Sequence, residues 1–144
     1  MVERNIDKVK TIKEPGDIFA TAIASDYVEM SNVGYVDFVI NTGVGTAANT
    51  TIKVKAKLGE DGEAEAIPFR IKSLTAEEFD EVTADGKAFS IGGTATKCGA
   101  CIVRVGSDSL KGEYDRVSIN TTAVSQSAVP GSIIAILHEP RYSK

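Results

Sequence analysis

The most reactive side chains of this sequence are those of two cysteines, Cys98 and Cys101, in the stretch KCGAC. A C-x-x-C pair does redox chemistry when it begins a helix, because the helix dipole lowers the pKa of a thiol there. Here the residues IVRV follow, and β-branched residues favour a strand. A structural zinc needs about four ligands, and His138 is the only histidine. We predict ordinary thiols, with Cys101 packed beside Val103 and Val105, and leave open whether the two cysteines ever pair.

A glycine-rich stretch, GVGTAA at residues 43–48, has the spacing of a dinucleotide-binding loop. Such a loop must begin a helix whose N-terminus holds the pyrophosphate, whereas this one leads into the alternating pattern of a strand. His138 is the only candidate for a histidine base, and no G-x-S-x-G nucleophile motif accompanies it. We therefore predict no catalytic residue, no cofactor and no metal site, and we do not expect an enzyme.

Alternation of apolar and polar residues dominates the chain and predicts strands. Residues 51–58 (TIKVKAKL) place four apolar residues on one face, and Thr51 and three lysines on the other. Segments rich in Gly, Asp, Ser and Thr separate further candidates, one of which lies within residues 17–30. The others are 34–40, 66–71, 88–91, 100–105, 116–121 and 132–138.

These short strands predict an all-β fold, a single-domain β-sandwich over residues 1–144, of which a jelly roll is one form. One segment, Thr75–Glu81, has the spacing of a capping box and predicts a short helix in a connection. Residues 1–18 are polar and lack a clear period. We expect them to form an extended N-terminal arm, either a frayed end or a tether that becomes ordered on a partner.

Two strand segments indicate surfaces that other molecules cover. The run Ile133–Leu137 is apolar on both faces, which predicts a central strand covered on two sides or one whose outer face is buried by another subunit. Lys53, Lys55 and Lys57 form a stripe on one face of their strand. Such lysines protect an exposed edge strand against aggregation, or they dock on an acidic protein surface; both explanations stay open.

Composition limits the classes of partner. The chain of 144 residues is 42% hydrophobic and 25% charged, with a net charge of −4, which is typical of a soluble globular protein and does not favour nucleic-acid binding. Its longest apolar run is too short to cross a bilayer, so we expect no membrane partner. The N-terminus lacks the apolar core of a signal peptide, and we expect synthesis and use without secretion.

The second half of the chain contains several strand segments and motifs in a distinctive order. An aliphatic strand, Cys101–Val105, precedes the motif L-x-G-x-Y-x-x-V-x-x-N within Asp108–Thr121, and Ser132–Leu137 leads to Pro140-Arg141-Tyr142. The likeness extends back to Ile67–Ile71. In this order the chain resembles small proteins of tailed bacteriophages that decorate or cement the capsid.

That resemblance implies a structural protein on the outer surface of the virion, made in the cytoplasm of a bacterial host. It would bind at junctions between major capsid subunits and stabilise the shell as a homo-oligomer, with a trimer favoured over a dimer. Its partners would then be the major capsid protein and further copies of itself. The residues that we expect at subunit or capsid contacts are Ile12, Ile18, Ile134, Ile136, Arg141 and Tyr142.

Two other functions fit a β-sandwich of this size. One is a module that binds carbohydrate or a receptor, although sugar sites favour exposed aromatic rings and this chain has no tryptophan. The other is a structural component of the phage neck or tail. Since one fold serves many functions, the fold alone does not separate these alternatives.

Overall fold

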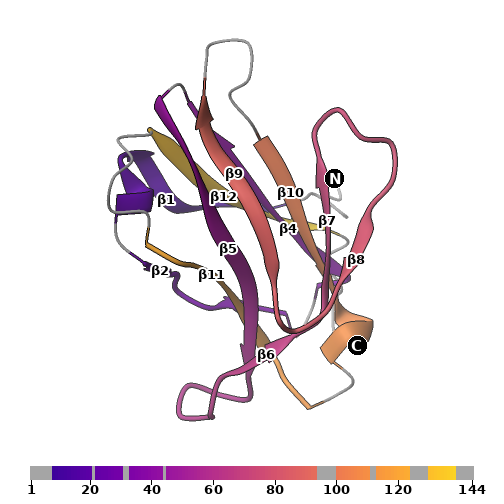
Figure 1. Cartoon of the computed structure of the whole chain (residues 1–144). Coiled ribbons are helices and arrows are strands. Elements are labelled where there is room, and N and C mark those ends of the chain that lie inside the picture. Colours follow the sequence, from indigo (N-terminus) through magenta and orange to yellow (C-terminus); the bar gives the residue numbers. More distant parts are fainter. Residues whose placement is uncertain are drawn as a thin grey trace, which may run out of the picture.

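The computed structural model describes residues 8–20, 22–30, 33–43, 45–93, 100–110, 113–123 and 130–138. Its strands form two antiparallel sheets that face each other (Figure 1). Sheet A has the order β1 (Lys8–Gly16), β12 (Gly131–His138), β4 (Tyr35–Thr42), β10 (Ala100–Gly106), β7 (Phe69–Ser73) and β8 (Asp80–Val82). Sheet B contains β2 (Ile23–Ala24), β3 (Val28–Glu29), β11 (Arg116–Thr121), β5 (Gly45–Lys57), β6 (Glu65–Ile67) and β9 (Lys87–Gly93).

The pairing of strands is nested from the two ends of the chain inward. The first strand pairs with the last, β2 and β3 pair with β11, β4 pairs with β10, and β5 pairs with β9. Rolled into two sheets, this nested order is the topology of a jelly roll. The strands β6, β7 and β8 are inserted between β5 and β9, and β7 and β8 extend sheet A beyond β10. The predicted all-β sandwich is confirmed, in its jelly-roll form.

The core lies between the sheets and follows the alternation seen in the sequence. In β10, Cys101, Val103 and Val105 are buried while the residues between them are half-buried. In β12, Ile133 and Ala135 are buried in the same way. Burying a valine or isoleucine side chain contributes about 1.5–3 kcal/mol relative to leaving it exposed. One face of each of these strands is therefore buried in the core, and the other face points outward.

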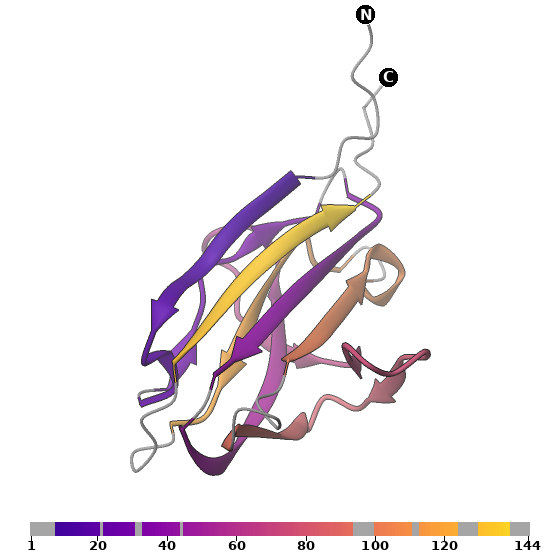
Figure 2. The same ribbon diagram turned by 90° about the horizontal axis from the view of Figure 1, so that it is seen from above.

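The expectation of an extended N-terminal arm is wrong for residues 8–16. These residues form β1, which pairs with β12 from Lys8 opposite Leu137 to Gly16 opposite Gly131. An edge strand of this kind is held mainly by backbone hydrogen bonds, so a clear hydrophobic period is not required. Figure 2 shows β1, β12 and β4 side by side. Residues 1–7 of the expected arm lie outside the described residues.

The helix expected at Thr75–Glu81 is also wrong. Residues 74–79 form turns and bends, and Asp80–Val82 is the edge strand β8, with Glu81 opposite Arg70 of β7. A helix of seven residues is marginal in isolation, and here strand pairing competes successfully with it. The helical elements among the described residues are the 3-10 turns η1 (Ile18–Ala20) and η2 (Ser107–Leu110). No helix in this part of the chain has the length and apolar character needed to span a membrane.

Candidate interaction surface

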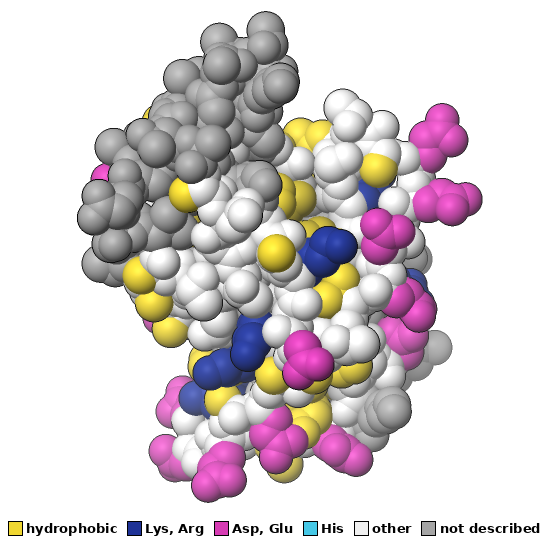
Figure 3. All heavy atoms as spheres, in the orientation of Figure 1, with side chains coloured by type: hydrophobic (Ala, Val, Ile, Leu, Met, Phe, Trp, Pro, Cys, Tyr) yellow, Lys and Arg dark blue, Asp and Glu magenta, His cyan; other side chains and the backbone are white. Residues whose placement is uncertain are grey.

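The outward-facing side of sheet B has the polar character expected of a sheet in water. Its central strand β5 carries Lys53, Lys55 and Lys57, and the neighbouring β11 carries Arg116 and Asn120. Figure 3 shows Lys and Arg side chains along this strand. An antiparallel sheet with one face in the core and one in water normally alternates in this way. The polar outward face of sheet B is therefore the standard with which the outward face of sheet A can be compared.

The outward-facing side of sheet A has an apolar centre instead. Ile134 of β12 stands opposite Val39 of β4, which in turn stands opposite Ile102 of β10. Ile136, the next residue of β12 on the same face as Ile134, stands opposite Val9 of β1. Val9 is 66% exposed, and the other four are half-buried. We call these five residues the apolar band.

No third layer of strands covers the band within the described part of the chain. Every strand that the structure describes belongs to sheet A or sheet B. A contiguous set of apolar side chains on an outward-facing sheet is a common mark of a protein interaction site. The band is therefore the candidate site of this molecule.

A charged cluster lies beside the band on the same face. Asp37 of β4 stands directly opposite Arg104 of β10. Arg104 Nε donates to Asp37 Oδ1 at 2.8 Å and Nη2 donates to Oδ2 at 2.9 Å, a bidentate contact. His138 Nε2 lies 3.0 Å from Asp37 Oδ2. The Asp37 side chain is only 7% exposed, although it points away from the core.

Aromatic rings complete the surroundings of Arg104. Its guanidinium carbon lies 4.4 Å from the centre of the Tyr35 ring and 4.3 Å from that of Phe79. Tyr35 in turn stacks on His138, with ring centres 4.4 Å apart. The hydrogen bonds with Asp37 are the main cause of a raised pKa of Arg104, so its charge is stabilised.

This arrangement makes the charged cluster compatible with a covered surface. A charge that enters an interface must lose water, and that loss is costly unless partners replace the water. Arg104 already has a carboxylate and two rings around it within the chain. A partner that covers sheet A would therefore meet a charge pair of which Asp37 is already desolvated and Arg104 is partly so.

The structure distributes the predicted contact residues unevenly. Ile134 and Ile136 lie in the apolar band, on the outward face that the sequence indicated. Ile12 and Ile18 are half-buried and pack against the core of their own chain. Arg141 and Tyr142 lie outside the described residues. Their roles in contacts with other molecules stay predictions.

Sequence reasoning missed three residues of the band and the whole charged cluster. Val39 and Asp37 alternate with buried residues in β4, so the period of two could have placed both on one face. The pairing of Asp37 with Arg104, 67 residues later, depends on the register between β4 and β10. That register is not visible in a single sequence.

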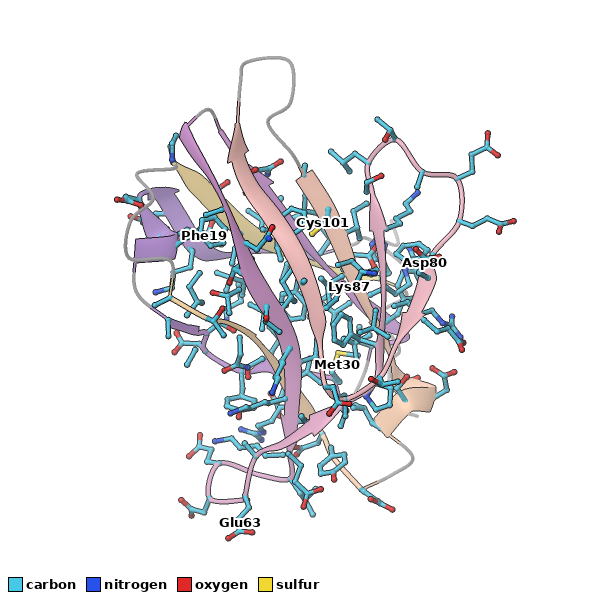
Figure 4. The ribbon with its side chains drawn as sticks, in the orientation of Figure 1. Phe19, Met30, Glu63, Asp80, Lys87 and Cys101 are labelled. Carbon is cyan, nitrogen blue, oxygen red and sulfur yellow. The ribbon has the colours of Figure 1, made fainter. Side chains whose placement is uncertain are left out.

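The two motifs with apparent chemistry have structural roles where they are described. Cys101 points into the core between the sheets (Figure 4), and burial raises its pKa to about 12. The thiol is thus protonated at neutral pH, and its predicted packing in one strand with Val103 and Val105 is confirmed. Cys98 lies outside the described residues. Residues 45–48 of the glycine-rich stretch are themselves part of the strand β5, so they do not begin a helix.

Metal-binding side chains do not converge in the described ranges. Among those residues, no group of three or more His, Cys, Asp or Glu side chains could hold a metal ion. A shallow hollow of about 280 Å³ beside β7 and β8 has Phe69, Arg70 and Ser109 in its lining. Phe69 is buried, so it offers no exposed ring for a sugar to stack on.

Comparison with known proteins gives a likeness of fold. The sequence matches no protein-family model, and a comparison with curated protein sequences finds no match. Among solved structures, the chain is similar to the crystal structure of the SPBc2 prophage-derived protein YomS, with a TM-score of 0.56 and 13% sequence identity. The likeness covers 95% of this chain and 96% of YomS, so the entire sandwich of this protein is similar in fold to a protein of prophage origin.

Proposed function

We propose that this protein is a structural virion protein that decorates a phage capsid. It binds the outer surface of the shell at junctions between major capsid subunits, and this binding stabilises the shell. The observation that carries the proposal is the apolar band on the outward face of sheet A, beside a charge pair compatible with burial. The prophage origin of YomS, a protein with a similar fold, supports a phage setting.

The physical requirements of such a role match the features of the chain. A decoration protein needs a rigid body and a complementary surface, and the jelly roll supplies the first while the band supplies the second. Each half-buried Val or Ile of the band that becomes covered contributes roughly 0.5–1 kcal/mol. Contacts repeated around a symmetric shell add through effective concentration, so that modest individual affinity suffices.

The test is co-sedimentation of the purified protein with capsid shells that lack it. We expect saturable binding at a copy number related to the symmetry of the shell. The double variant Ile102→Thr with Ile134→Thr should bind about tenfold more weakly or worse, because two apolar contacts are removed. The matched control is Leu58→Thr with Leu74→Thr, which changes two leucines that are 60% and 54% exposed outside the band.

Two results would contradict the proposal. Absence of wild-type binding to every assembly state of the shell would exclude the capsid role and direct attention to the phage neck and tail. Equal weakening by the band variant and the leucine control would exclude the band as the contact surface.

A further inference from the structure

The lysine stripe on sheet B occupies an interior strand. Lys53, Lys55 and Lys57 belong to β5, which pairs with β11 along one side and with β6 and β9 along the other. Protection of an edge strand, one of the two explanations drawn from the sequence, is therefore wrong for this strand. The lysines follow one another at about 7 Å along the outward face.

Neighbouring strands add no acidic residue opposite the stripe. In the register with β11, Lys53 stands opposite Asn120, Lys55 opposite Ser118 and Lys57 opposite Arg116. On the other side, Lys55 stands opposite Ala66 of β6. Like charges side by side on a sheet repel, so this arrangement is unfavourable in the isolated chain.

Acidic groups reduce the charge at the Lys57 end of the stripe. Arg116 forms ion pairs with Asp115 at 3.0 Å and with Glu29 at 3.8 Å. Lys57 Nζ donates to the carbonyl oxygen of Glu60 at 2.8 Å and lies 4.3 Å from the centre of the Tyr27 ring. These contacts involve Lys57 and the neighbouring Arg116, whereas Lys53 and Lys55 lie nearer the start of β5.

An acidic segment lies at the edge of sheet A that β8 forms. The connection from β7 to β8 and the start of β8 carry four exposed carboxylates, which we call the acidic loop: Glu77, Glu78, Asp80 and Glu81. Glu81 lies 3.9 Å from Arg70, a long contact between exposed side chains. Figure 4 marks Asp80 at this edge, and Figure 3 shows acidic side chains along the margin of the molecule.

The acidic loop is held in place by the residue in its middle. The Phe79 ring contacts the guanidinium of Arg104 at 4.3 Å and lies 5.3 Å from Lys72 Nζ. Lys72 Nζ also donates to the carbonyl oxygen of Ala76 at 3.4 Å. The carboxylates are therefore presented on a fixed segment, which lowers the entropy lost on binding.

We infer that the lysine stripe of one copy binds the acidic loop of the next copy. The stripe lies in the middle of sheet B and the loop at the outer edge of sheet A, so they are separate surfaces of one chain. Their opposite charges make them complementary between copies. Because the two surfaces differ, the contact is head to tail, and its repetition closes into a ring or continues as a filament. This contact does not depend on capsid binding.

The test is sedimentation velocity of the purified full chain, without any capsid, over a range of concentrations. At about 50 mM salt we expect a concentration-dependent oligomer, and at about 500 mM salt we expect weaker association because the charges are screened. Two reversals should each weaken self-association by about tenfold or more. One is Lys53→Glu with Lys55→Glu in the stripe, and the other replaces all four carboxylates of the acidic loop: Glu77→Lys, Glu78→Lys, Asp80→Lys and Glu81→Lys. The control reversal, Asp61→Lys with Glu63→Lys, lies in another exposed hairpin and should associate like the wild type.

Mixing the two reversed variants provides the decisive result. The acidic stripe of the first variant then faces the basic loop of the second, and the remaining stripe and loop are also complementary. We expect the equimolar mixture to regain association that neither variant has alone, in alternating assemblies with even numbers of copies. A wild-type protein that stays monomeric at low salt, or a mixture that does not associate, would overturn the inference. Both results leave the capsid proposal to its own test.

Discussion

Asp37 is a carboxylate that points away from the core and yet has lost most of its contact with water. Its side chain is 7% exposed, and its two oxygens contact Arg104 and His138. A buried charge of this kind is stable only while its partners are present. At the residue scale, the account therefore depends on the pair formed by Asp37 and Arg104.

Replacement of Asp37 by alanine should lower the free energy of unfolding by about 2 kcal/mol, because Arg104 loses a bidentate acceptor in a partly covered site. Urea unfolding measures the change. Asp115→Ala is the control, since this carboxylate also contacts an arginine but is 31% exposed, and its loss should be smaller. Arg104→Met should also cost less in the Asp37→Ala protein than in the wild type. Unchanged stability of Asp37→Ala would contradict this description of the pair.

At the scale of elements, the sequence predicted strands well where both neighbours of a strand are strands. The alternation at residues 100–105, 116–121 and 132–138 corresponds to β10, β11 and β12, which lie inside their sheets. The predicted strand 66–71 is divided at Pro68, where β6 of sheet B ends and β7 of sheet A begins. Proline lacks the N–H that a continuous ladder requires, which explains the division.

Edge strands and cross-strand pairs could not be predicted in the same way. β1 and β8 lie at the two edges of sheet A, where one side of each strand has no neighbour in the sheet. Their sequences need only part of the hydrophobic pattern. In the sequence alone, the polar residues 1–18 therefore favour an arm, and the capping-box spacing of Thr75–Glu81 favours a helix. The band and the charged cluster join residues from several strands, and their assembly depends on register.

Phe79→Ala tests how the β7–β8 connection is held. The ring contacts Arg104 and Lys72, and a cation–π contact at a partly exposed site is worth about 1 kcal/mol. We expect faster amide hydrogen exchange in residues 74–82 with little change in β12. Leu74→Ala lies in the same connection with a 54% exposed side chain and should leave the exchange unchanged. Equal exchange in Phe79→Ala and the wild type would show that the ring does not anchor the segment.

At the scale of the whole molecule, the two outward faces of one sandwich differ in chemistry. Sheet A has an apolar band with a compensated charge pair, and sheet B has a row of lysines. Such a molecule can contact a surface with the band on sheet A, and its own copies through the lysine stripe on sheet B and the acidic loop at the edge of sheet A. The jelly roll makes this separation because each sheet has a single face available to partners.

Chemical labelling of a single cysteine on the band tests the central claim most directly. In a Cys98→Ser protein, Cys101 is buried and weakly reactive, so Ile136→Cys reports on the band, and Glu63→Cys reports on an exposed hairpin away from it. The account predicts that binding to capsid shells slows maleimide labelling of Ile136→Cys by about tenfold or more and leaves Glu63→Cys unchanged. Equal labelling of Ile136→Cys in the free and shell-bound protein would contradict the claim that sheet A is the docking face.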